Sequence, residues 1–186
     1  TLHLMPSKNP YILRQKEKGA PLFIPFTVLG DPNPAGSLQV IRTLIENGAD
    51  ALELGLPFSD PPADGPVIQA ADVRALESGT TMDDCFAVLK QVRAMTDIPV
   101  SLLVYSNLVF QRGVEKFYAD AAASGVTSVL VADLPLEHAE EIVPFARKYG
   151  IHPVFLVSEL TTEARLNEIM KFADGYLYVV SYLGVT

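Results

Sequence analysis

The segment ALELGLPFSDPPADGPVIQA, residues 51–70, contains a short strand, a proline-rich loop and the start of a helix. Strand alternation places Leu52 and Leu54 on one face and Glu53 on the other. Pro66 is typical of the first turn of a helix. If both faces of the strand are buried, an isolated carboxylate at Glu53 is costly unless it is partnered or protonated, which indicates a chemical use. The alternative is an edge strand with Glu53 in water.

The same alternation of strand and helix extends outward from this segment over the whole chain. Strands are predicted at residues 22–29, 51–55, 99–105, 128–133, 153–157 and 175–181. Helices are predicted at Pro10–Lys18, from a Ser37 cap to Gly48, at Pro66–Glu77, after Thr80 or Thr81, at Gly113–Ser124, at Leu136–Tyr149, and after Thr161 or Thr162 with Leu166, Ile169 and Met170 inward. Strands that are apolar nearly throughout and alternate with helices indicate a parallel sheet covered by helices.

Two architectures fit this pattern, a doubly wound open sheet and an eight-stranded (β/α) barrel. The doubly wound sheet usually has a glycine-rich phosphate turn after its first strand, whereas this chain has Gly-Asp-Pro-Asn-Pro at residues 30–34. The barrel is therefore favoured. Because a barrel needs eight strands and the chain supplies six, we expect an α/β protein of the (β/α)8 TIM-barrel class. Residues 1–186 would form a single domain that is C-terminally incomplete, with the last two strands missing.

Composition excludes several classes of function. The 186 residues are 49% hydrophobic, enough for one domain with a large core, and the net charge of −8 without a basic stripe argues against nucleic acid. Cys85 is the only cysteine, which fits a reducing cytoplasm. No apolar run approaches the ~20 residues of a membrane helix. The charges between Lys8 and Lys18 argue against a signal peptide.

The longest interval between strand and following helix comes directly after Glu53, and barrel active sites are built on such loops. Asp64 stands in this loop, either as a helix cap or as a second catalytic carboxylate. Asp133 ends a predicted strand, either in a turn or cap role or at the barrel mouth. Tyr105 and Tyr178 are either core aromatics or mouth residues.

Several chemistries are disfavoured. None of His3, His138 and His152 ends a strand, so a Ser–His–Asp or Cys–His site is not expected. No cluster has metal-ligand spacing, so no metal is predicted. Lysines fall on predicted helices, which disfavours a Schiff-base aldolase. Carboxylate acid–base catalysis by Glu53, with Asp64 as the second candidate, remains.

The motif LELGLPFSDPPADGPVIQ resembles the signature of the tryptophan synthase alpha subunit family. FIPFTVLGDP, SLLVYSNLVF, VLVADLP and GYLYVVSYLGVT resemble its other segments in the same order, from Leu22 to Thr186. The resemblance implies a (β/α)8 barrel lyase that cleaves indole-3-glycerol phosphate to indole and glyceraldehyde 3-phosphate. It also implies an alpha2beta2 complex with a pyridoxal-phosphate beta subunit and no cofactor in the alpha subunit itself.

The resemblance further assigns residues. It implies catalytic roles for Glu53 and Asp64, and a beta-subunit contact at the Pro57–Asp60 loop. The implied substrate pocket is lined by Phe26, Leu103, Tyr105, Tyr178 and Thr186.

The sequence departs from the family pattern at three places. Tyr182-Leu183 replaces an arginine and a small residue, Val157-Ser158-Glu159 replaces a proline-rich turn, and Pro62 replaces leucine. The last two strands and the glycine-rich phosphate loops are also absent, so we expect a fragment of a longer chain. Two rivals stay open: a subunit that only activates a beta partner, which the altered 182–183 loop supports, and a stand-alone indole-releasing lyase that needs no partner.

Overall fold

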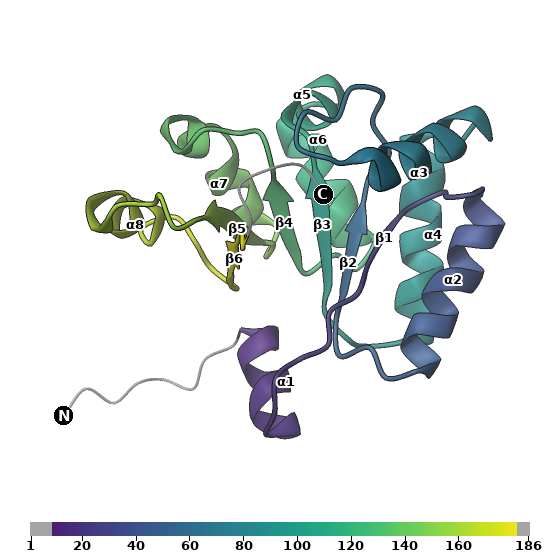
Figure 1. Ribbon diagram of the computed structural model, residues 1–186, viewed down its shortest axis with the longest axis horizontal. Coiled ribbons are helices and arrows are strands. Elements are labelled where there is room, and N and C mark those ends of the chain that lie inside the picture. Colours follow the sequence, from purple (N-terminus) through teal and green to yellow (C-terminus); the bar gives the residue numbers. More distant parts are fainter. Residues whose placement is uncertain (1–8, 182–186) are drawn as a thin grey trace.

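The sheet has six parallel strands hydrogen-bonded in chain order, with no reversal (Figure 1). The structure is a computed structural model that describes residues 9–181. The strands are β1 (Phe26–Val28), β2 (Leu52–Gly55), β3 (Val100–Val104), β4 (Ser128–Val131), β5 (His152–Val157) and β6 (Leu177–Val179). A doubly wound sheet reverses its strand order, so the uninterrupted order confirms the barrel class, of which the first six units are present.

Helices connect the strands. They are α1 (Pro10–Lys18), α2 (Pro34–Glu46), α3 (Pro66–Glu77), α4 (Met82–Met95), α5 (Ser106–Arg112), α6 (Val114–Ala123), α7 (Ala139–Lys148) and α8 (Glu163–Ile169), with a 3₁₀ turn, η1 (Leu136–His138), before α7. The bounds of α1 and α3 are those predicted. No helix among residues 9–181 is long and apolar enough to cross a membrane.

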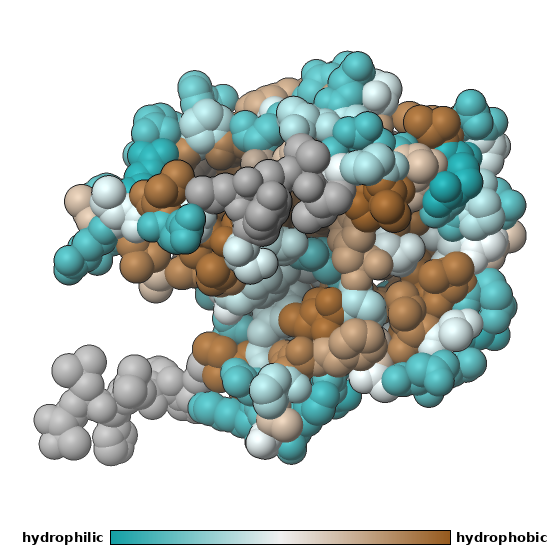
Figure 2. Space-filling model, viewed as in Figure 1, coloured by the Kyte–Doolittle hydropathy of each residue, from teal (hydrophilic) through white to brown (hydrophobic). Residues whose placement is uncertain are grey.

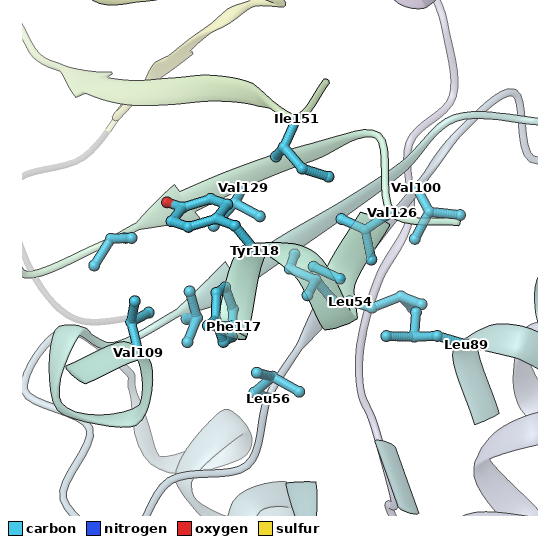
Figure 3. Close-up of a cluster of buried hydrophobic side chains, with 14 of the residues drawn as sticks. Leu54, Leu56, Leu89, Val100, Val109, Phe117, Tyr118, Val126, Val129 and Ile151 are labelled. Carbon is cyan, nitrogen blue, oxygen red and sulfur yellow. The ribbon is translucent and has the colours of Figure 1, made fainter. Parts of the chain in front are cut away.

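The outer face of the sheet forms the main core. Leu52, Leu54 and Leu102 are fully buried there, in one cluster with Leu89 of α4 and Phe117 of α6. Figure 3 shows Leu54, Leu89 and Phe117 of this cluster. Burying one such leucine contributes roughly 1.5–3 kcal/mol to folding. The predicted division of β2 into a helix-facing leucine pair and an inward Glu53 is therefore confirmed.

The interpretation of Glu53 as an exposed edge residue is wrong. Its strand pairs with β1 on one side and with β3 on the other, and Glu53 is only 7% exposed. The two neighbours remove it from water, so its carboxylate needs the partners described below.

Two local predictions also fail. The N-cap of α2 is Asn33, whose side chain accepts the Gly36 amide at 2.9 Å, and Ser37 is buried inside the helix. Asn33 followed by Pro34 is the stronger start signal, because asparagine caps well and proline suits the first turn. Met170 follows the end of α8 and is 55% exposed, so it does not face inward.

Helix α1 closes the N-terminal end of the sheet (Figure 1). The Tyr11 ring packs edge-on against Tyr176, with centroids 4.8 Å apart, and its hydroxyl lies 2.6 Å from Ser128 Oγ. The Asn9 amide donates to the Gly175 carbonyl at 2.7 Å. The first described helix therefore binds the segment leading into the sixth strand.

Leu54 provides a test of this core. We expect Leu54→Ala to lower the free energy of unfolding by about 2–5 kcal/mol, because it leaves a cavity between β2 and the helices. Urea denaturation measures the change. The matched control is Leu160→Ala, at a leucine that is 72% exposed, and it should stay within about 0.5 kcal/mol of the parent. Equal effects of the two variants would contradict the assignment of Leu54 to the core.

Candidate active site

Glu53 lies on the inner face of β2, in register with Phe26 of β1 and Ser101 of β3. The Tyr176 hydroxyl is 2.9 Å from Ser101 Oγ and 3.4 Å from Glu53 Oε1, and it can donate its proton to either. Burial raises the pKa of the Glu53 carboxyl to about 7, and the Tyr176 hydrogen bond opposes this rise. Glu53 is thus balanced between its neutral and ionised forms near neutral pH.

The groups beneath Glu53 are hydroxyls. Burial raises the pKa of Tyr11 to about 12, and burial together with the Glu53 charge raises the pKa of Tyr176 as well. Both tyrosines therefore stay neutral at pH 7. They supply hydrogen-bonding groups without a positive charge, which is why desolvation dominates the pKa of Glu53.

Asp64 is held at the C-terminal end of the sheet by Tyr105. The Tyr105 hydroxyl donates to Asp64 Oδ2 at 2.8 Å, and the Phe58 ring stacks on Tyr105 at 5.3 Å between centroids. The N-cap of α3 is Gly65, without a side-chain cap bond, so the Asp64 carboxylate is not the helix cap. The 56–65 loop is folded back so that a half-buried carboxylate meets the end of β3.

The predicted pocket residues Phe26, Leu103 and Tyr178 are half-buried on the same inner face as Glu53. Gly55 leaves room beside them, since a Cβ there would lie 2.9 Å from the Phe26 ring. Figure 2 shows this face hollowed between the part of the molecule that carries α1 and the part that carries α8. Thr186 and the Tyr182-Leu183 segment lie outside the described residues.

A cavity of about 170 Å³ opens beside the C-terminal ends of β4 and β5. Its lining includes Leu130 and Leu156 from the strands, Ile169 of α8, and Arg165, whose guanidinium pairs with Glu137. The sequence singled out neither Leu130 nor Leu156, because apolar strand residues carry no functional signal of their own.

The remaining predicted positions either hold a neighbouring element in place or lie at the surface. Asp133 accepts the Ser106 backbone amide at 2.7 Å and the Ser106 hydroxyl at 2.9 Å, so its carboxylate binds the first residue of α5, a helix that precedes it by 27 residues. Pro57 is buried, whereas Asp60 is exposed beside Ser59. Among residues 9–181, no group of three or more His, Cys, Asp or Glu side chains could hold a metal ion.

Sequence reasoning missed Tyr176, which contacts Glu53, and Ser101, which contacts Tyr176. Alternation puts Tyr176 on the face of Tyr178, but only the curvature of the sheet brings β6 opposite β2. The usable signal was a small polar residue, Ser101, within an otherwise apolar strand.

This geometry defines a (β/α)-barrel protein with one carboxylate, Glu53, on the inner face of its sheet and another, Asp64, at the C-terminal end. The family model "Tryptophan synthase alpha chain" matches residues 12–186, and the chain belongs to that family.

Relatives agree with this assignment. The tryptophan synthase alpha chain of Photobacterium profundum is 52% identical over 175 residues, which cover 94% of this chain. The chain spans 64% of the length of that relative.

Solved structures also agree. The tryptophan synthase alpha subunit of Legionella pneumophila str. Paris superposes with a TM-score of 0.89 at 36% identity, over 94% of this chain and 68% of its own. A chain of the tryptophan synthase a2b2 complex of Pyrococcus furiosus superposes with a TM-score of 0.82 at 40% identity, over 87% of this chain and 68% of its own.

The raised pKa of Glu53 predicts a pH-dependent stability cost. The ordinary pKa of 4.5 applies in the unfolded chain and a value of about 7 in the fold, so folding opposes ionisation. The destabilisation is absent below pH ~4.5, grows as pH rises, and is complete above pH ~7. The stability of Glu53→Gln relative to the parent should therefore increase as pH rises from ~4.5 to ~8. The increase in the free energy of unfolding should reach up to about 3 kcal/mol.

Urea denaturation of both proteins at the two pH values measures this gain. The matched control is Glu77→Gln, at an exposed glutamate, and it should show no such pH-dependent gain. A difference between parent and Glu53→Gln that does not change with pH would contradict the desolvation of Glu53.

Proposed function

We propose that the protein containing this chain cleaves indole-3-glycerol phosphate to indole and glyceraldehyde 3-phosphate, with Glu53 and Asp64 as the acid–base pair. The observation that carries the proposal is the desolvated Glu53 carboxyl, with its pKa of about 7, on the inner face of a barrel sheet. Membership of the tryptophan synthase alpha chain family supports the choice of substrate.

Glu53 has the protonation behaviour that this reaction needs. The bond to be broken is a retro-aldol bond without a carbonyl on the indole side, so the ring carbon bearing the glycerol chain must first gain a proton. Neutral Glu53 donates that proton. The resulting carboxylate then removes the proton of the side-chain hydroxyl, the carbon–carbon bond breaks, its electron pair returns to the ring, and an aldehyde forms. A group with a pKa near the working pH performs both transfers efficiently.

Asp64 complements this role as an anion. Protonation of the ring carbon places positive charge on the ring nitrogen, and a fixed carboxylate that accepts the N–H hydrogen bond stabilises that charge. The Tyr105 hydroxyl, 2.8 Å away, orients the Asp64 carboxylate. Proton transfers suffice for these steps, so the proposal includes no cofactor in this subunit and leaves pyridoxal phosphate to a beta partner.

The proposed partner is a tryptophan synthase beta subunit, in an alpha2beta2 complex located in the cytoplasm. The related Pyrococcus furiosus chain belongs to an a2b2 complex. We place the contact on the loop of Pro57–Asp60, where Asp60 is exposed and Phe58 stacks on Tyr105. A protein docked on Asp60 would act on the Tyr105–Asp64 contact through only a few residues.

Glu53→Gln tests the catalytic assignment. Glutamine keeps the size of the side chain but cannot exchange the proton, so turnover should fall by roughly 10²–10⁴-fold. That loss corresponds to about 3–5 kcal/mol of barrier. Steady-state indole release, with and without a beta subunit, measures turnover, and a substrate-analogue titration should show retained binding. Asp64→Asn should also be severe, but less so.

The exposed Glu77 again provides the control, since Glu77→Gln should turn over like the parent. Turnover of Glu53→Gln within a few-fold of the parent would make Glu53 an ordinary buried carboxylate. The same assay separates the lyase from the two rivals: an activating subunit releases no indole, and a stand-alone enzyme gains nothing from the partner.

Asp60→Lys tests the placement of the partner. Reversing an exposed charge on the docking loop should raise the dissociation constant for the beta subunit without altering circular dichroism. Asp97→Lys makes the same change at an exposed position just before β3, at the opposite end of the sheet, and should have no effect. Isothermal titration calorimetry compares the affinities of the two variants for the beta subunit. Equal affinities would contradict the placement of the partner contact on this loop.

A further inference from the structure

Helix α3 carries a carboxylate in a core position that the proposed mechanism does not use. The helix packs on β1 through Ile68, Ala71 and Ala75, against Val28 and its neighbours. Asp72 lies on the same helical face, four residues after Ile68, and is 4% exposed. A helix face that is otherwise small and apolar therefore buries an acidic side chain next to the loop that bears Asp64.

The surroundings of Asp72 leave it incompletely partnered. The Phe58 backbone amide donates to its carboxyl group, but Asp72 Oδ2 has no hydrogen-bond partner among residues 9–181. Three titratable groups act on it from other elements: Asp64 in the 56–65 loop, Asp31 after β1, and Tyr105 at the end of β3.

The nearby cation is already engaged. The Arg74 guanidinium, also on α3, binds both oxygens of Asp31 at 2.7 and 2.8 Å. The charged groups that act on Asp72 are thus acidic, and the hydrogen bond from the Phe58 amide offsets only part of the cost of a negative charge there. Burial first, and then the charges of Asp64 and Asp31, raise the pKa of Asp72 to about 7.

We propose that Asp72 is a positioning residue for Asp64, and that its proton decides whether Asp64 stays on Tyr105. Neutral Asp72 permits the arrangement described above, in which Phe58 and Asp64 both meet the Tyr105 side chain. Ionised Asp72 repels the Asp64 carboxylate, which weakens the Tyr105–Asp64 bond and loosens the Asp64 end of the 56–65 loop, while the Phe58 amide remains a donor to Asp72. The loop is therefore closed on the acidic side of neutrality and loosened on the alkaline side.

The first test does not depend on the proposed function. Hydrogen–deuterium exchange of the 56–65 amides, corrected for the intrinsic pH dependence of exchange, is measured on the full-length protein from pH 6 to pH 8.5. Protection of the parent loop should fall about threefold to tenfold across this range, the size of one like-charge interaction in a partly buried site. Asp72→Asn keeps the shape and the hydrogen-bond acceptor but is always neutral, so its protection should stay constant.

Two further variants sharpen this test. Asp72→Ser introduces a smaller side chain that is also neutral, and its protection should be constant as well. Agreement between the two variants would show that the result comes from the lost charge and not from a packing defect of asparagine. Asp97→Asn removes an exposed carboxylate before β3 and should keep the parental fall. A pH-dependent loss of protection that persists in both Asp72 variants would overturn the proposal.

The second test rests on the proposed function and uses the pH profile. Because Asp64 contacts the bound ring, the parent KM for indole-3-glycerol phosphate should rise about threefold to tenfold above pH 7, while the KM of Asp72→Asn stays flat. The pH dependence of kcat, set by Glu53, should be the same in both. A merely structural Asp72 would change kcat and KM at every pH. Absence of indole release in the parent would refute the proposed function alone, because the exchange experiment still decides the role of Asp72.

Discussion

Glu53 is the constraint on which the rest of the site depends, because a carboxylate that is 7% exposed is tolerated only if its neutral form is accessible or its charge is compensated. This fold provides the Tyr176 hydroxyl and no close cation among the described residues, so burial shifts the carboxyl toward its neutral form. Its strand is fixed on both sides by β1 and β3, and its outer face is anchored by Leu52 and Leu54. The packing that stabilises the fold therefore also keeps the carboxyl from turning toward water.

The two catalytic candidates are held by different means. Glu53 belongs to a central strand and is desolvated by the sheet, whereas Asp64 belongs to a loop and depends on one hydrogen bond from Tyr105. A strand residue cannot move without disturbing the core, but a loop residue can respond to a neighbour or a partner. Regulation of this site is therefore expected to act through Asp64 and its loop rather than through Glu53.

The sequence was sufficient for the features that rest on local periodicity. The leucines that flank Glu53 revealed its inward direction, Pro66 marked a real helix start, and of the two candidate caps Thr80 and Thr81 the second is the N-cap of α4. The absence of a glycine-rich turn after the first strand favoured a barrel over a doubly wound sheet, and the strand order of a barrel was then expected. Ser37 failed as a cap because Asn33 competes a turn earlier. A pattern locates an element but does not decide between two nearby starts.

Contacts between distant segments were beyond this kind of reasoning. Tyr176 reaches Glu53 only because the sheet curves enough to bring β6 across from β2, and Tyr11 joins them only because α1 closes the same end. No local pattern at residue 53 encodes a hydroxyl 123 residues away. The surroundings of Glu53 are consequently assembled from segments that lie far apart in the chain. The strand that bears the acid is fixed by its neighbours β1 and β3, whereas the hydroxyl that contacts the carboxyl is supplied by the segment leading into β6, which packs on α1.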